Sequence, residues 1–195
     1  MNLRTIAILR GFATSTSRHL AEQCWDAGLD LVEVPVQDDA GWAALAAVAE
    51  CAQGRPFGAG TVLSVDDVNR AVDLGASVVV SPGIAADVVE AAARAGAMPL
   101  PGVFTPSDVT LAARLGVTTC KLFPASQVGP GWLGALHGPF PEMRFVAVGG
   151  IDLDNAADYL RAGAAGVGFG GSIERILRCA DPSGEVAALH ALVAT

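Results

Sequence analysis

The sequence predicts a closed (β/α)8 barrel, in one domain spanning residues 1–195. Three observations carry this prediction: glycine recurs at intervals of 20 to 26 residues, each of these glycines follows an alanine-rich stretch of helical character, and each precedes a short apolar run. Glycine at the end of a helix accepts the left-handed conformation without steric cost. The seven recurring positions are Gly28, Gly54, Gly75, Gly96, Gly116, Gly138 and Gly163. Short strands alternating regularly with helices predict a parallel barrel.

The apolar runs define eight expected strands. They comprise residues 5–9, 29–34, 57–60, 77–80, 97–100, 117–123, 144–148 and 165–169. An open, doubly wound sheet is the competing architecture for such an alternation. However, the first run is not followed by the GxGxxG pattern that marks nucleotide-binding sheets of that kind.

Several helix starts are also marked in the sequence. Acidic or capping side chains occur at residues 66–67, 106–108 and 152–154, where they would stabilise the positive end of a helix dipole. The segment after Asp181 is expected to form a last helix that packs on the barrel.

Composition and charge exclude several classes of function. The chain has 52% hydrophobic residues but no apolar run long enough to cross a bilayer, and its N-terminus lacks the layout of a signal peptide. A net charge of −8 argues against nucleic acid or an anionic membrane as a partner. Four cysteines without CxxC spacing predict reduced thiols in a cytoplasmic protein. Three isolated histidines make a metal site unexpected.

Lys121 is the only lysine in the chain, because the other eleven basic positions are arginine. It lies within an apolar run that is expected to be a buried strand. Arginine keeps its proton in proteins, whereas a buried lysine can lose it and act as a nucleophile in Schiff-base chemistry. The alternative is that base composition favours arginine and that Lys121 extends its amine to the strand end.

Strand alternation places a second ionisable residue opposite this lysine. Thr119, Lys121 and Phe123 share one face of their strand, and the apolar side chains around Glu33 leave that carboxylate facing the barrel interior. Both strands are even-numbered, so Glu33 and Lys121 can share a layer with a ligand between them. A buried salt bridge of purely structural value is the alternative.

Anion-binding groups are expected at the same end of the barrel. Arg10 follows the first strand, and its guanidinium suits a carboxylate or a phosphate, unless it is an ordinary loop arginine. The loops after the seventh and eighth strands contain residues 149–150 and 168–172, both rich in glycine. In (β/α)8 barrels these two loops commonly bind phosphate, although turns also require glycine.

Six segments resemble the 2-keto-3-deoxy-6-phosphogluconate aldolase family, over about residues 5–175. They are IAILRG at 6–11, VEVP at 32–35, GAGTVL at 58–63, SPG at 81–83, KLFPA at 121–125 and VGGI at 148–151. The resemblance implies a class I aldolase, free of metal and cofactor, that acts as a homotrimer on a phosphorylated keto-deoxy sugar acid. It implies that Lys121 forms the Schiff base, that Glu33 is the acid and base, and that Thr61 contacts the keto acid. For the phosphate it implies the residues Gly149, Gly150, Gly170, Gly171 and Ser172.

The resemblance divides between two branches that differ in the sugar epimer. Gln37 and Val148 stand where the phosphogluconate branch has arginine and threonine, and together with Arg10 they resemble the phosphogalactonate branch. The loop at 170–172 is more similar to the phosphogluconate branch. We therefore expect cleavage of 2-keto-3-deoxy-6-phosphogalactonate to pyruvate and glyceraldehyde 3-phosphate, with the gluconate epimer as the alternative substrate. A phosphosugar isomerase, a metal-dependent class II aldolase and a non-catalytic phosphate-binding barrel remain as other classes.

Overall fold

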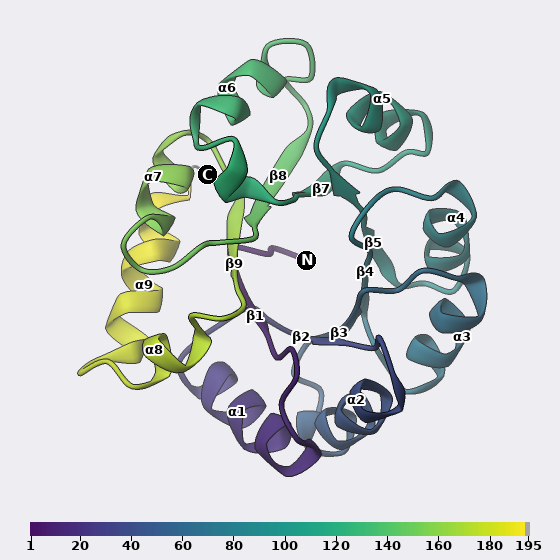
Figure 1. Ribbon diagram of the computed structural model, residues 1–195, viewed down its shortest axis with the longest axis vertical. Coiled ribbons are helices and arrows are strands. Elements are labelled where there is room, and N and C mark those ends of the chain that lie inside the picture. Colours follow the sequence, from purple (N-terminus) through teal and green to yellow (C-terminus); the bar gives the residue numbers. More distant parts are fainter. Residues whose placement is uncertain (194–195) are drawn as a thin grey trace.

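A computed structural model describes residues 1–193, so the last two residues of the expected domain lie outside the described residues. The strands of this part of the chain form one parallel sheet that curves into a barrel, with the helices outside it (Figure 1). The strands are β1 (Thr5–Ile8), β2 (Leu31–Pro35), β3 (Phe57–Gly60), β4 (Val78–Val80), β5 (Met98–Leu100), β6 (Gly102–Val103), β7 (Thr119–Leu122), β8 (Arg144–Val148) and β9 (Gly166–Phe169). The (β/α)8 prediction is thereby confirmed.

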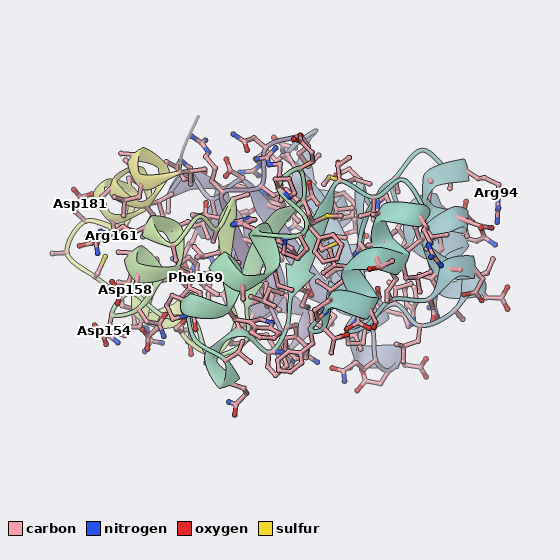
Figure 2. The ribbon with its side chains drawn as sticks, turned by 90° about the horizontal axis from the view of Figure 1, so that it is seen from above. Arg94, Asp154, Asp158, Arg161, Phe169 and Asp181 are labelled. Carbon is pink, nitrogen blue, oxygen red and sulfur yellow. The ribbon has the colours of Figure 1, made fainter. Side chains whose placement is uncertain are left out.

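The helices follow the strands in alternation. They are α1 (Thr14–Asp26), α2 (Asp39–Ala52), α3 (Val65–Asp73), α4 (Ala86–Arg94), α5 (Pro106–Arg114), the 3-10 helix η1 (Ala125–Gln127), α6 (Gly131–His137), α7 (Ala156–Arg161), α8 (Ile173–Leu177) and α9 (Pro182–Leu192). Charged side chains such as Arg94, Asp158 and Arg161 lie on the outside of this ring (Figure 2). No helix within residues 1–193 is both long and apolar enough to span a bilayer.

The fifth barrel position is occupied by two short strands: β5 matches the run expected at residues 97–100, and β6 follows it outside the expected range. The sheet of residues 1–193 therefore has nine strands at eight barrel positions. β5 pairs with β4, and β6 pairs with β7. Pro101 separates them because it has no N–H to donate to a neighbouring strand. Its carbonyl still accepts a hydrogen bond from the Lys121 backbone N–H at 2.9 Å, so the barrel remains closed.

Side-chain alternation separates two apolar layers. The interior cluster includes Leu3, Ile6 and Val146, whereas Cys120 and Leu122 belong to the larger cluster between the strands and the helices. In the view of Figure 1 the N-terminal segment runs from near the centre of the ring to the strands, and its Leu3 is buried in the interior cluster. The neighbours of Lys121 on β7 therefore face the helices, as predicted, and Lys121 itself faces inward.

The left-handed conformation expected at the recurring glycines is mostly confirmed. Six of the seven recurring glycines have positive φ, but Gly138 has φ −52° and this prediction was wrong. After α6 the chain keeps right-handed, helix-like hydrogen bonds, from Gly138 N to Gly134 O and from Phe140 N to Leu136 O, so no left-handed residue is needed there.

The predicted helix starts are also confirmed in part. Asp66 and Asp67 lie in the first turn of α3, and Thr105 and Asp108 form a reciprocal capping box at α5. The expected start at residues 152–154 is wrong, because α7 begins only at Ala156. The Asp152 carboxylate instead accepts backbone hydrogen bonds within the preceding loop. The last helix, α9, is present as predicted, and the Asp181 side chain caps it by accepting a hydrogen bond from the Gly184 backbone N–H.

Candidate active site

The structure brings Lys121 and Glu33 together inside the barrel. Lys121 is on β7 and Glu33 is on β2, and their side chains are 4% and 1% exposed. The Lys121 Nζ lies 4.0 Å from the Glu33 Oε1. Two residues of opposite charge on separate strands therefore share one buried layer, which is the arrangement that the alternation predicted.

The Glu33 carboxylate has an unusual environment for a buried charge. Both of its oxygen atoms are buried, and neither has a hydrogen-bond partner among residues 1–193. A buried carboxylate without donors costs several kcal/mol, and an ion pair at 4.0 Å compensates only part of that. The carboxylate is therefore free to accept a proton or a hydrogen bond from a ligand or a water molecule.

Gly60, at the end of β3, makes room for this carboxylate. A Cβ placed at Gly60 would lie 2.0 Å from Glu33 Oε1 and 2.7 Å from its Cδ. The next residue, Thr61, has φ +57°, a conformation that a β-branched residue seldom adopts and that occurs preferentially at functional sites. Sequence reasoning noted the GAGTVL motif but missed the specific requirement for glycine at position 60.

A cavity of about 500 Å³ opens at the carboxyl ends of the strands. Lys121 reaches it from the barrel interior. Six other residues of the predicted site also line it: Arg10, Gly149, Gly150, Gly170, Gly171 and Ser172. Glu33 and Thr61 do not line it, but each contacts a residue that does: Glu33 lies 4.0 Å from Lys121, and Thr61 accepts a hydrogen bond from Arg10.

Arg10 connects the rim of the cavity to the neighbouring loops. Its guanidinium donates to Gln37 Oε1 and, at 3.4 Å, to Thr61 Oγ1. These three residues follow β1, β2 and β3, at the same end of the barrel. Because the Arg10 side chain is exposed at this rim, it can meet an anionic group that enters the cavity.

The two glycine loops differ in what their glycines do. Gly149 and Gly150 have φ of +95° and +73°, and a Cβ on Gly150 would lie 2.3 Å from the Ser126 Oγ. A Cβ on Gly170 or Gly171 would meet no atom within 4 Å. The first loop therefore needs glycine for its own conformation, whereas the second has space that a ligand can occupy.

Arg175 also lines the cavity and was missed by sequence reasoning. Both of its terminal nitrogens donate to the Asp154 carboxylate at 2.8 Å, so that α8 is tied to the loop after β8. The hydrogen bond and the charge of Arg175 hold the pKa of Asp154 below its usual value. The sequence shows only an arginine three residues after Ser172. Arginine is common on surface helices, so its presence there does not predict that it lines a cavity.

The other candidate reactive groups are poorly placed for chemistry. Burial raises the pKa of the Cys24 and Cys120 thiols to about 12, so both stay protonated and are weak nucleophiles near neutral pH. Within residues 1–193 no three His, Cys, Asp or Glu side chains are grouped so that they could hold a metal ion. The reactive groups of the cavity are thus Lys121 and the carboxylate behind it.

A (β/α)8 barrel with an ionisable pair in its interior and an anion-suited cavity at the carboxyl ends of its strands is the architecture of an enzyme for small anionic substrates. The family model for Aldolase: KDPG and KHG aldolase matches residues 2–189, and the chain belongs to this family. The protein is accordingly an aldolase, a carbon–carbon lyase.

Individual relatives agree with this assignment. The chain is 35% identical to a probable 2-dehydro-3-deoxy-6-phosphogalactonate aldolase of Rhizobium meliloti (strain 1021), over 86% of this chain and 80% of the relative. A solved structure described as native KDPGal superposes with a TM-score of 0.88 and 29% identity, over 98% and 97% of the two chains. The KDPG aldolase from Legionella pneumophila, with pyruvate captured at low pH as a covalent carbinolamine intermediate, superposes with a TM-score of 0.82 and 26% identity, over 99% and 95%.

Proposed function

We propose that the protein is a class I aldolase that cleaves 2-keto-3-deoxy-6-phosphogalactonate to pyruvate and glyceraldehyde 3-phosphate. The observation that carries the proposal is the buried Lys121, whose Nζ lies 4.0 Å from a carboxylate without hydrogen-bond donors. The name of the Rhizobium relative supports the substrate. The pyruvate carbinolamine in the Legionella relative supports covalent chemistry.

The reaction begins at Lys121. Its neutral amine attacks the C2 ketone to form a carbinolamine, and loss of water leaves an iminium that can accept an electron pair. Glu33, through a water molecule, takes the proton of the C4 hydroxyl, and the C3–C4 bond breaks with its electrons moving into the iminium. Glyceraldehyde 3-phosphate leaves and an enamine of pyruvate remains on the lysine.

The second half returns the enzyme to its starting state. Glu33 gives the proton to C3 of the enamine, which restores the iminium, and water then hydrolyses it to pyruvate and free Lys121. The unpartnered state of the Glu33 oxygens suits this role, because the carboxyl group must alternate between accepting and donating a proton.

The remaining predicted residues hold the substrate. Arg10, which donates a hydrogen bond to Thr61, would bind the carboxylate of the keto acid at the rim of the cavity. The glycine loops with Ser172 would bind the phosphate, and this remote binding keeps the reacting carbons in register. We further propose one domain, a homotrimer and a cytoplasmic location, with no nucleic acid or membrane as a partner. The family resemblance supports the trimer, and the unpaired thiols support the compartment.

The gluconate epimer is the second candidate substrate. The similarity to a KDPG aldolase and the loop at residues 170–172 favour it. A coupled assay for glyceraldehyde 3-phosphate on both epimers distinguishes the candidates. Faster turnover of the gluconate epimer would contradict the galactonate proposal and leave the aldolase in place.

Borohydride trapping with pyruvate tests the covalent step. We expect one reduced pyruvyl group per chain, located at Lys121 by peptide mapping. Because this is the only lysine in the sequence, peptide mapping distinguishes labelling of its side chain from labelling of an α-amine. Lys121→Met should lose both labelling and cleavage, and Lys121→Arg keeps the charge as a control but should be equally inactive. Turnover by either variant would overturn the Schiff-base proposal; binding without turnover by the wild-type protein would indicate a non-catalytic barrel.

A further inference from the structure

A second cavity of about 500 Å³ lies at the opposite end of the barrel. The first cavity contacts Ile8 and Val148, where β1 and β8 end, whereas the second contacts Arg4 and Arg144, where the same strands begin. Its wall also includes parts of α9 and of the loops before β8 and β9. No step of the proposed reaction uses this cavity.

The charge of this cavity is opposite to that of the chain. Its ionisable lining residues within residues 1–193 are Arg4, His137, Arg144 and His190, and none of its lining residues is acidic. Two of the three histidines of the sequence are therefore here, in a chain whose net charge is −8. A chain with this overall charge repels anions from most of its surface, so a basic cavity is a specific local exception.

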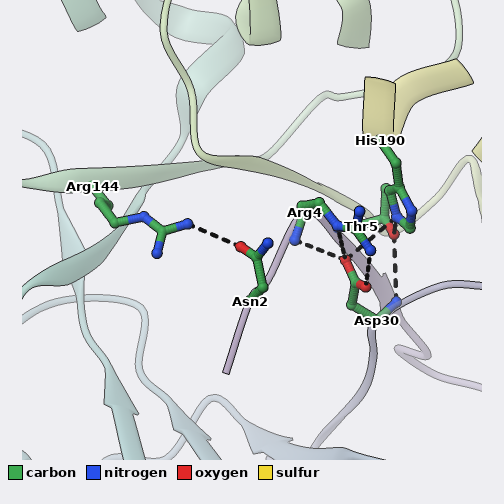
Figure 3. Close-up of polar contacts among 6 residues, drawn as sticks. All are labelled: Asn2, Arg4, Thr5, Asp30, Arg144 and His190. Carbon is green, nitrogen blue, oxygen red and sulfur yellow. Dashed lines mark hydrogen bonds and ion pairs between the residues drawn. The ribbon is translucent and has the colours of Figure 1, made fainter. Parts of the chain in front are cut away.

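Asp30, which does not line this cavity, holds two of the basic lining residues, Arg4 and His190, in place. The Asp30 carboxylate accepts hydrogen bonds from the backbone N–H groups of Arg4 and Thr5 and from the Arg4 guanidinium (Figure 3). The His190 Nε2 lies 2.8 Å from the Thr5 Oγ1 and 3.4 Å from Asp30. Burial is the main cause that lowers the pKa of His190, so this ring is neutral near pH 7. Asp30 thus neutralises Arg4 and orients it together with His190.

Arg144 is not neutralised in this way. Its guanidinium donates to the Asn2 Oδ1 at 3.0 Å, which is an amide oxygen and carries no charge (Figure 3). No ion pair joins Arg144 to a carboxylate within residues 1–193. Because the Asn2 oxygen is engaged, the amide nitrogen of Asn2 is left as a donor beside the guanidinium. The Nη1 of Arg4 also has no acceptor among the described residues.

We propose that this cavity binds a small oxyanion of the phosphate or carboxylate kind, held by Arg144 with Asn2 and Arg4. Three features support the proposal: donors from the N-terminal segment and from β8 line the same cavity, Asp30 holds Arg4 in position, and the cavity is as large as the one that contains Lys121. Planar guanidinium groups bind both classes of anion through paired N–H donors. The proposed aldolase reaction does not use this site, so each of the two proposals can be tested without the other.

Amide chemical-shift titrations of the whole protein test the proposal, with inorganic phosphate and succinate as separate probes. We expect saturable shifts at Arg144 and Ala165, distinct from shifts at Gly170 and Gly171, and the two probes show which class of anion binds more tightly. Arg144→Gln should weaken binding at this cavity at least about tenfold. The matched control is Arg94→Gln, which removes the same charge from an exposed arginine on α4 and should leave binding unchanged.

Three results would overturn the proposal: shifts confined to the cavity of Lys121, shifts that do not saturate, or equal binding by Arg144→Gln and Arg94→Gln. Arg144→Lys keeps the charge without the planar fork and should bind with intermediate affinity. If Arg144→Gln fails to fold, then Arg144→Lys and Asn2→Ala decide the question, because unchanged binding by both variants contradicts the proposed contacts.

Discussion

At the scale of single residues, the Glu33 carboxylate lies in an environment that does not favour stability. Its two buried oxygens have no hydrogen-bond donor among residues 1–193, and its ionic partner in that range is the Lys121 amine at 4.0 Å. A carboxylate placed for stability would accept hydrogen bonds, as Asp30 does at the other end of the barrel. A Cβ at position 60 would overlap the same carboxylate, so a larger residue there would have to displace the Glu33 side chain. These features favour a proton-transfer role over a structural salt bridge.

Replacement of Glu33 by glutamine tests this role. Glu33→Gln preserves the size of the side chain but cannot take a proton, so turnover should fall by about 10² to 10⁴. Trapping of pyruvate on Lys121 should be less impaired, because the carboxylate acts mainly on C3 and C4. Steady-state kinetics and borohydride labelling measure the two effects. Near-normal turnover with a lowered melting temperature would support the structural salt bridge instead.

Val148 tests the choice of epimer. It lies at the end of β8, lines the cavity of Lys121 and has no hydrogen-bonding group. Val148→Thr replaces a methyl group by a hydroxyl and keeps the size of the side chain. Leaving one buried hydrogen-bonding group without a partner costs about 1–3 kcal/mol. We expect the wild-type protein to cleave the galactonate epimer faster and the variant to shift the ratio toward the gluconate epimer. The ratio of kcat/KM on the two epimers measures the shift, and an unchanged ratio would remove Val148 from the basis of the assignment.

At the scale of loops and helices, the loop after β9 is a cleaner probe of phosphate binding than the loop after β8. Gly171 has open space around it, whereas Gly150 has a positive φ and a Cβ there would lie 2.3 Å from the Ser126 Oγ. A substitution at Gly150 therefore cannot report on phosphate binding alone. A substitution there disturbs the fold of its loop as well.

We expect Gly171→Val to raise KM for the phosphorylated substrate about tenfold or more while leaving pyruvate exchange largely intact. Gly150→Val should lower the melting temperature and impair both reactions, because a β-branched residue is strained at φ +73°. The two variants serve as controls for each other. Equal losses of substrate cleavage and pyruvate exchange in Gly171→Val would show that this loop shapes the barrel and does not hold phosphate.

At the scale of the whole molecule, His190 connects the last helix to the first two strands. It lies on α9 and contacts Thr5 on β1 and Asp30 next to β2. Burial is the main cause that lowers its pKa from 6.5, with Arg4 acting in the same direction and Asp30 against it. The unfolded chain therefore binds more protons than the folded chain as the pH falls through 6.5, so this residue destabilises the fold in acid.

Denaturant unfolding at about pH 7.5 and about pH 5.5 measures this effect. The free energy of unfolding should be lower at the acidic pH, and His190→Gln should lose less stability between the two. His19→Gln is the control, because His19 is an exposed histidine on α1. Equal pH dependence of wild-type and His190→Gln protein would exclude His190 as the source. The carboxylates of Asp108 and Asp154, whose pKa values are lowered, protonate only at more acidic pH and do not interfere with the comparison.

The sequence by itself determined the local structure and the inward orientation of Glu33 and Lys121. Helix ends marked by glycine, the capping side chains at residues 66–67 and 106–108, and the alternation along β2 and β7 are short-range properties, so a linear pattern is sufficient to predict them. The period of the repeat predicted the barrel, and barrel geometry then predicted that Glu33 and Lys121 meet. Where local rules compete, as at Gly138 and Pro101, the pattern was insufficient.

Only the tertiary structure decided which side chains have partners. Four features depend on residues distant in the sequence. They are the lack of donors for Glu33 among residues 1–193, the close approach of Gly60 to Glu33, the pair of Arg175 with Asp154 between α8 and the loop after β8, and the basic cavity around Arg144. Each depends on the angles at which strands and helices pack, and a shift of about 1 Å is enough to make or break such a contact. Strand alternation specifies the face on which a residue lies, but packing in three dimensions specifies what that residue meets there.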